Sequence, residues 1–212
     1  MLIAYLIAAY IIGSIPTAVI AGRLLKQIDI REHGSGNAGA TNVFRVLGWK
    51  PGLTVLLIDM LKGFIVVFYL SALVPYNNGL DYVLIQVAGG LAAILGHIFT
   101  LFASFRGGKG VGTAAGVFLG LEPLTVLICL LIFIVIVWIT RYVSLGSLIA
   151  ACMLPLLLSV KLYLLKMPVS PYIFYISLIL LATIIITHRS NIKRLINGQE
   201  NKLTFSHQGT GR

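Results

Sequence analysis

Residues 104–116 read Ser104-Phe-Arg-Gly-Gly-Lys-Gly-Val-Gly-Thr-Ala-Ala-Gly116, and this glycine-rich, cationic stretch interrupts an otherwise hydrophobic sequence. Glycine lets a backbone turn several N–H groups toward one point, and Arg106 and Lys109 add positive charge beside them. This combination predicts an anion site, and phosphate suits it best. Two other polar stretches, 33–45 and 188–200, have the same character. We therefore expect the hydrophobic segments to bring three polar stretches together at one membrane surface.

Two nucleotide-binding patterns come close to matching and are rejected. The phosphate-binding loop of nucleoside triphosphatases requires Gly, four residues and then Gly-Lys-Ser/Thr, whereas Ala103 is not glycine and Gly110 follows Lys109. Residues Gly34–Gly39 fit the G-x-G-x-x-G pattern letter for letter. They follow a charged run instead of a buried strand, however, in a chain without alternating strands and helices. We interpret that match as coincidence.

The composition is that of an integral membrane protein. The 212 residues are 58% hydrophobic, with a mean hydropathy of +1.00. Several apolar runs exceed the length that a helix needs to cross roughly 30 Å of hydrocarbon, which predicts an all-α, polytopic bundle in a single domain, residues 1–212. Residues 1–22 have no basic region before them and no cleavage site, so we expect a retained first helix. Cys129 and Cys152 lie apart in hydrophobic runs and are interpreted as packing residues.

Seven transmembrane helices are predicted, and the fourth is short. Their ranges are about 2–21, 51–74, 82–103, 111–121, 123–140, 148–165 and 171–187, with a turn at Asn77–Gly79. The fourth segment is too short to cross a full bilayer, but counting it places all three polar stretches on one side. Gly112, Gly116 and Gly120 recur every four residues and predict a face for close helix packing. We expect this helix to be buried, with its N-terminus directed at the anion site.

The charge distribution predicts the orientation. The formal net charge is +10, and most basic residues fall beside the three polar stretches, against Lys161 and Lys166 on the opposite side. The positive-inside rule makes the polar side cytoplasmic, with the N-terminus outside and the C-terminus in the cytoplasm. The basic residues lack the aromatic-interleaved face of a nucleic-acid surface, so we expect no nucleic acid partner. Anionic membrane lipids and anionic substrates fit better.

One ion pair is predicted inside a span. Asp59 and Lys62 lie three residues apart on one face of the second helix. An intramembrane charge pair is a functional hypothesis by default. Its place near the start of the helix favours a structural clamp behind the polar site.

The first polar stretch combines hydroxyls, amides and one guanidinium. Arg45 can hold a phosphate through two parallel hydrogen bonds. An ordinary turn-rich connector has a similar composition, and that alternative stays open from this stretch alone. The other candidate ligands here are Ser35, Gly36, Asn37, Thr41 and Asn42.

The central stretch places Lys109 just before a helix N-terminus, where a phosphate gains from the helix dipole and from free N–H groups. Ser144 and Ser147 can add hydroxyls at the start of the sixth helix, or can cap it. The remaining candidates of the central stretch are Gly107, Gly108, Gly110 and Thr113.

The third stretch carries His188, Asn191 and Arg194 at intervals of three, on one helical face. His188 alone can be a surface histidine, but its neighbours favour a phosphate ligand or a hydroxyl-orienting group. The sequence contains no carboxylate pair, metal-ligand cluster, nucleophile elbow or Cys–His pair, so we expect no metal, cofactor or protein nucleophile. The predicted chemistry is transfer between two phosphorylated molecules by charge and positioning.

Three segments resemble the signature motifs of the bacterial membrane acyl-phosphate:glycerol-3-phosphate acyltransferases. They are Gly-Ser-Gly-Asn-Ala-Gly-Ala-Thr-Asn-Val-Phe-Arg at 34–45, Gly-Gly-Lys-Gly-Val-Gly-Thr at 107–113 and His-Arg-Ser-Asn-Ile-Lys-Arg-Leu-Ile-Asn-Gly-Gln-Glu at 188–200. Their order and spacing match along nearly the whole chain. The one departure is Gly112, where the family commonly has alanine.

The resemblance implies a seven-helix enzyme of the bacterial inner membrane whose motifs face the cytoplasm. It implies transfer of a fatty acyl group from acyl phosphate to the 1-hydroxyl of glycerol 3-phosphate, which gives lysophosphatidic acid and inorganic phosphate in the first step of phospholipid synthesis. It also implies that Ser35, Arg45 and Lys109 contact phosphate groups, while His188 and Asn191 engage glycerol 3-phosphate. We expect a monomer.

The reaction needs a held geometry and a neutralised leaving phosphate. Arg45, Lys109 and His188 are the expected catalytic residues. The proton of the attacking hydroxyl can pass to His188 or to a phosphate oxygen of the donor, and we favour the phosphate. The competing class is a transporter or flippase for phosphorylated molecules, but the polar residues gather on one side instead of the membrane midplane. A membrane scaffold is a more distant alternative.

Overall fold

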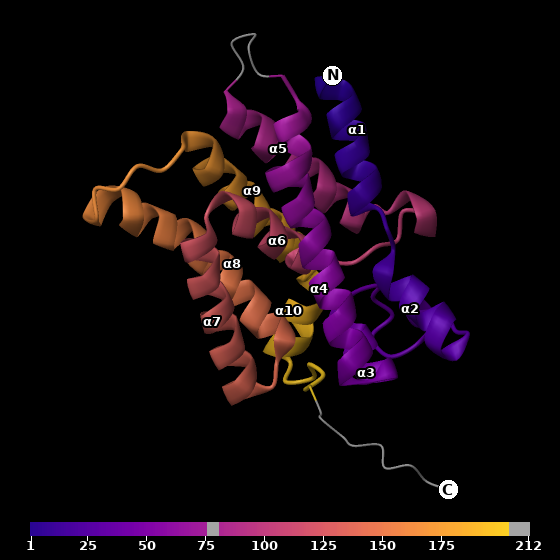
Figure 1. Ribbon diagram of the computed structural model, residues 1–212. Helices are drawn as coiled ribbons and strands as arrows, with labels where there is room; N and C mark the ends of the chain where they lie inside the picture. The colour runs from indigo at the N-terminus through magenta and orange to yellow at the C-terminus, as the bar shows by residue number, and fades with distance from the viewer. Residues whose placement is uncertain (76–80, 204–212) are drawn as a thin grey trace, which may run out of the picture.

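The computed structural model describes residues 1–75 and 81–203, which contain helices and no strand. The expected turn at Asn77–Gly79 lies outside the described residues. The α-helices, shown in Figure 1, are α1 (Leu2–Gly13), α2 (Thr17–Lys26), α3 (Ala40–Leu47), α4 (Trp49–Ile65), α5 (Tyr82–Ile98), α6 (Val111–Leu121), α7 (Pro123–Thr140), α8 (Val143–Ser159), α9 (Pro171–Thr187) and α10 (Arg189–Ile196).

The described residues hold five helical stretches that are long and apolar enough to cross a membrane. A sixth candidate consists of α9 and α10, which meet at a bend of 62°. The helix α6 is apolar, but its 11 residues extend only about 16 Å. The all-helical membrane architecture is thus confirmed. The five stretches are Leu2–Lys26, Trp49–Leu73, Tyr82–Ala103, Pro123–Thr140 and Val143–Leu164.

Several helix boundaries differ from the predictions. The first span is broken between Gly13 and Thr17, because Pro16 has no N–H to donate and its ring excludes a continuous helix. The helix α8 begins at Val143 instead of 148, so Ser144 and Ser147 lie within it and not in a preceding loop. The helix α3 forms inside the expected connector. The predicted ranges of α6, α7 and α9 are confirmed.

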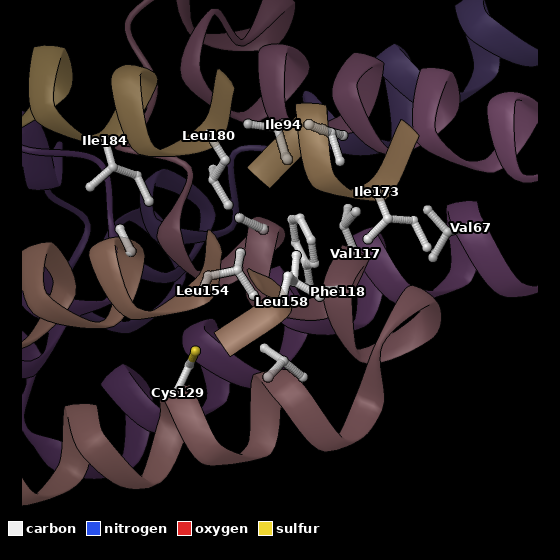
Figure 2. Packing of buried hydrophobic residues seen from close by; sticks show 14 of the residues in the cluster. Val67, Ile94, Val117, Phe118, Cys129, Leu154, Leu158, Ile173, Leu180 and Ile184 are labelled. Carbon is white, nitrogen blue, oxygen red and sulfur yellow. The ribbon is translucent and has the colours of Figure 1, made fainter. Parts of the chain in front are cut away.

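The helix α6 occupies the interior of the bundle, and none of its residues is exposed. The predicted glycine face is confirmed: Gly116 lies so close to Met60 of α4 that a Cβ atom there would overlap the Met60 carbonyl. Phe118 is fully buried on the same helix. Figure 2 shows its ring beside Leu154 and Leu158 of α8, in the largest cluster of buried apolar side chains.

The polar segments gather at one end of the bundle. In Figure 1 the N-terminus lies at the upper end, while α2, α3 and α10 lie at the lower end. A hydrogen bond joins the segments just before the first and the central polar stretches, since Arg31 Nη1 donates to the carbonyl of Ala103 at 2.8 Å. Near the other end, Lys161 Nζ lies 2.7 Å from a carboxylate oxygen of Glu122, at the junction of α6 and α7.

Candidate active site

The central glycine-rich loop rests on the end of α5. Gly107 and Gly108 donate their N–H groups to the carbonyls of Ile98 and His97, at 3.0 and 3.1 Å. These N–H groups are therefore committed to α5, contrary to the expectation that they point at an anion. Gly110 has a φ of +85°, which favours glycine, and leads the chain into α6.

Lys109 stands just before the N-terminus of α6. The first N–H groups of a helix lack intrahelical partners, and the N-cap Gly110 has no side chain to bond them. Lys109 Nζ donates to Asn191 Oδ1 of α10. Burial lowers the pKa of Lys109 to about 8, so the amine is still mainly charged at neutral pH. A cation and a helix N-terminus therefore lie together, as an anion site requires.

Glu200 organises the third polar stretch. Its Oε1 accepts hydrogen bonds from Asn191 Nδ2 at 2.7 Å and from Ser144 Oγ at 3.0 Å. Its Oε2 accepts from Arg194 Nε at 2.7 Å. Burial opposes ionisation of Glu200, but the hydrogen bonds from Asn191, Arg194 and Ser144 outweigh it and hold the pKa of this carboxyl below its ordinary value. One carboxylate thus orients three of the predicted site residues.

His188 is buried at the junction of α9 and α10. Its Nδ1 lies 2.9 Å from the carbonyl oxygen of Ile184. Burial, reinforced by the charge of Lys109, lowers the pKa of His188 to about 4, so the ring is neutral at physiological pH. Since Nδ1 must carry the proton to bond a carbonyl, Nε2 is the free acceptor of this ring.

Arg45, on α3, lies beside the residues just described. These residues and Arg45 are called the Lys109 cluster, which consists of Arg45, Lys109, Ser144, His188, Asn191, Arg194 and Glu200. Arg45 Nη2 donates to the carbonyl of Asn201 at 3.0 Å, and this arginine lies close enough to Glu200 and Lys109 to interact with them electrostatically. Its buried Nε has no hydrogen-bond partner in the described part of the chain. Because buried donors are rarely left unpaired, this N–H suits a ligand oxygen.

The rest of the first stretch is arranged differently. Asn42 is fully buried and holds the loop itself: its Nδ2 donates to the carbonyls of Ile30 and His33, and its Oδ1 accepts from the N–H of Ser35. All of its polar atoms serve the loop, contrary to the expectation that it binds substrate. Ser35 and Gly36 are exposed, and Asn37 and Thr41 are half-buried. Within the described residues, no hydrogen bond joins these four to the Lys109 cluster.

Two predicted hydroxyls face other surroundings. Ser147 Oγ donates to the carbonyl of Val143 at 3.0 Å, and neither Ser147 nor Ser144 caps α8. Thr113 is fully buried in α6, and its hydroxyl has no partner among residues 1–75 and 81–203. Thr113 and Arg45 Nε are therefore unsatisfied polar groups near the polar end of the bundle.

An apolar pocket lies beside this cluster. It encloses about 660 Å³ including its open mouth, between α6, α7, α8 and α9, with α4 at one side. Val111, Ser147 and Ile184 line it at the end nearest Lys109 and His188, and Phe118 lines its deeper part. Cys129 also lines it, whereas Cys152 is exposed on α8 instead of packed as expected.

Sequence reasoning gave no role to three contributors. They are Glu200, the carbonyl of Asn201, and Thr187, whose hydroxyl lies 3.4 Å from the carbonyl of Lys109. A signal for Glu200 was present, because it is the single acid in a stretch that carries Arg189, Lys193 and Arg194. For Asn201 and Thr187 the sequence offers no signal.

Apolar helices, a cationic cluster at one end and an adjacent apolar pocket define an integral membrane protein whose polar end suits an amphiphilic anion. A family model described as glycerol-3-phosphate acyltransferase matches residues 3–198. Similar proteins include the glycerol-3-phosphate acyltransferases of Chlorobium luteolum, 43% identical over 228 residues, and of Chlorobaculum parvum, 46% identical over 224 residues; each match covers 96% of this chain and 97% of the relative.

Solved structures agree with this assignment. Two crystal structures of PlsY (YgiH), an integral membrane glycerol 3-phosphate acyltransferase, match with a TM-score of 0.81. The glycerol 3-phosphate form is 36% identical and the lysophosphatidic acid form 37%, and each comparison covers 96% of both chains. This chain belongs to the glycerol-3-phosphate acyltransferase family. It is an integral membrane acyltransferase that acylates glycerol 3-phosphate in phospholipid synthesis.

Proposed function

We propose that the acyl donor is an acyl phosphate and that the products are lysophosphatidic acid and inorganic phosphate. The observation that carries this proposal is the shared border of two unlike sites. A cluster with Lys109, Arg45 and an uncapped helix N-terminus suits phosphate, and the pocket that begins at Val111 and Ile184 suits a hydrocarbon chain. An acyl phosphate has both parts joined at the reacting carbonyl.

In this proposal the cations hold the phosphate groups of both substrates, and the third stretch holds the rest of the acceptor. Arg45 and Lys109 neutralise the phosphate groups, and the partnerless Nε of Arg45 bonds a phosphate oxygen. Asn191 and His188 engage glycerol 3-phosphate, with Asn191 and Arg194 oriented by Glu200. The exposed Ser35 and Gly36 and the half-buried Asn37 and Thr41 add phosphate contacts when substrate is present.

The reaction is a direct acyl transfer. The 1-hydroxyl oxygen of glycerol 3-phosphate attacks the carbonyl carbon, the bond from that carbon to the phosphate oxygen breaks, and the hydroxyl proton goes to the departing phosphate. His188, with its pKa of about 4, is a weak base, whereas the departing phosphate becomes more basic as its bond to the acyl carbon breaks. We therefore assign His188 Nε2 the task of orienting the hydroxyl. Holding both reactants in the attack geometry is worth roughly 7 to 11 kcal/mol in all, and His188 is one of several residues that contribute to it.

The membrane arrangement belongs to the same proposal. If α6 is counted as a short fourth crossing, the chain crosses the membrane seven times. The Lys109 cluster and the C-terminal segment then lie on the cytoplasmic face of a bacterial inner membrane, with the N-terminus outside. The proposal takes the enzyme to be a monomer. Cysteine-accessibility labelling from each side of the membrane, at Lys193 and at Lys166, tests this topology.

The deciding experiment uses purified protein in lipid with palmitoyl phosphate and labelled glycerol 3-phosphate. We expect labelled lysophosphatidic acid and inorganic phosphate from the wild type, and a loss of at least 100-fold in Lys109→Ala. Palmitoyl-CoA is the donor control and is expected to give no product. Product from the thioester but not from the acyl phosphate would overturn the assignment of the donor.

His188→Ala separates the two proton routes. If the donor phosphate takes the proton, this variant keeps measurable turnover, with a raised KM for glycerol 3-phosphate. Complete loss of turnover with unchanged substrate binding would make His188 the base.

A further inference from the structure

A buried polar cluster behind the active site joins three segments of the bundle. Asp59 of α4 accepts a hydrogen bond at its Oδ1 from Thr17 Oγ1 of α2 at 2.6 Å and an ion pair from Lys62 at 2.8 Å. His97 Nδ1 of α5 lies 3.6 Å from the same oxygen. Lys62 also donates to the carbonyl of Ile15, in the break between α1 and α2. The predicted Asp59–Lys62 pair is thus confirmed, with additional partners.

This buried cluster adds little to the stability of the fold, because the free energy of desolvating ionised groups often exceeds the free energy of their attraction. The side chains of Asp59, Lys62 and His97 are 5%, 4% and 7% exposed. An apolar core of the same volume would hold the helices together at least as well. A polar cluster at this position is explained if it holds a neighbouring segment of the chain in place.

That segment is the loop that carries Lys109. The N–H of Gly108 donates to the carbonyl of His97, and a Cβ atom on Gly108 would overlap His97 Nε2. Gly108 has no positive φ, so lack of space next to the imidazole, and not backbone conformation, requires glycine there. The imidazole therefore forms the surface on which the residue before Lys109 rests.

We propose that His97, held by Asp59, is a positioning residue that fixes Lys109 for phosphate. The inference rests on the proposed function, in which Lys109 holds a substrate phosphate. A displacement of about 1 Å at a catalytic group can cost 100-fold in rate. In this arrangement Asp59 lies 3.6 Å from one edge of the ring, the other edge limits where Gly108 can lie, and Gly108 sets the start of Lys109.

The test is a double-mutant cycle between His97→Ala and Gly108→Ala. Gly108→Ala alone pushes the loop off the ring, and we expect kcat to fall about 100-fold. His97→Ala alone removes the support and should lower kcat about 10-fold. In the double variant the new methyl occupies space left by the ring, so we expect kcat at least 10-fold above that of Gly108→Ala. Effects that multiply independently would overturn the proposal, and so would an unchanged kcat in His97→Ala.

A matched clash elsewhere on α5 provides the control. A Cβ atom on Gly89 would overlap the hydroxyl of Tyr5, remote from Lys109 in the α1–α5 contact. Gly89→Ala should lower the unfolding temperature while the folded enzyme keeps its kcat. If Gly108→Ala behaves like Gly89→Ala, with lost stability and an unchanged kcat, then His97 has a structural role only and the proposal fails.

A second readout does not depend on turnover. The rate at which an amine-specific reagent modifies Lys109, followed by mass spectrometry, reports its environment with and without glycerol 3-phosphate. We expect glycerol 3-phosphate to protect Lys109 at least fivefold less in His97→Ala than in the wild type, and equal protection overturns the positioning role. If the wild type binds glycerol 3-phosphate but makes no product from acyl phosphate, the proposed donor fails while this comparison still decides the role of His97.

Discussion

Replacing Glu200 by glutamine tests the arrangement of the active site most directly. The carboxylate accepts three hydrogen bonds with its two oxygens, whereas the amide offers one oxygen and places an NH2 group against a donor. A hydrogen bond to a charged group is worth about 1.5–3 kcal/mol. The share from Arg194, whose side chain is 35% exposed, is discounted for solvent screening. Glu200→Gln should therefore weaken the hydrogen bonds that hold the site residues by about 2 kcal/mol in total.

That loss is measurable in two ways. If it falls on the position of Asn191, kcat/KM for glycerol 3-phosphate drops about 30-fold, since 1.4 kcal/mol corresponds to a factor of ten. The negative charge that raises the pKa of Lys109 also disappears, so this pKa falls below about 8. Initial rates of labelled product formation measure the first effect and their pH dependence measures the second, while thermal unfolding of the same preparations reports stability. The matched control is Glu32→Gln at an exposed position. Rates and unfolding temperatures for Glu200→Gln within twofold and 1 °C of the wild type would refute the reasoning.

Three further outcomes are expected. Phosphate binding raises the pKa of Lys109 above about 8, so the affinity for glycerol 3-phosphate falls as pH rises through 8, and binding takes up a proton there. Calorimetry in buffers of different ionisation enthalpy measures both effects, and Lys109→Arg should show neither. Arg45→Lys loses the two-point grip on phosphate and should raise KM about 10- to 100-fold with kcat less affected; an unchanged KM would count against this contact. Gly116→Ala meets the backbone of Met60 and should destabilise the protein by about 1–3 kcal/mol, while Gly112→Ala, whose Cβ would lie 3.3 Å from Asp59 Cβ, should be nearly neutral in thermal unfolding.

The sequence was most informative where one local pattern fixed the outcome. The Glu122-Pro123 pair indicated where α6 ends and α7 begins, and the glycine spacing of α6 predicted its packing face, because helix starts and close packing depend on short-range chemistry. The break at Pro16 was missed, since the hydrophobic run continues through it. The helix α3 was also missed, because it depends on packing of Phe44 against Gly52 of the next helix.

For the site, residue types could be predicted but not the directions of polar groups. The glycines of the central loop were expected to offer N–H groups to an anion, yet Gly107 and Gly108 bond α5. Asn42 was placed among the ligands, although its amide holds its own loop. The link from Ser144 to Glu200 joins residues 56 apart in the sequence, and no local pattern reports such a pairing.

The shortness of α6 has a consequence for how the protein is made. A segment of 11 residues, half of them small, is too short to leave the translocon for lipid by itself. Only Glu122 separates it from α7, which is long and strongly apolar, so we expect the two to enter the bilayer together. The glycine face of α6 then needs α4 already in place to receive it. We therefore expect ordered biogenesis, in which the loop that carries Lys109 reaches its working position only after α6 has packed against α4.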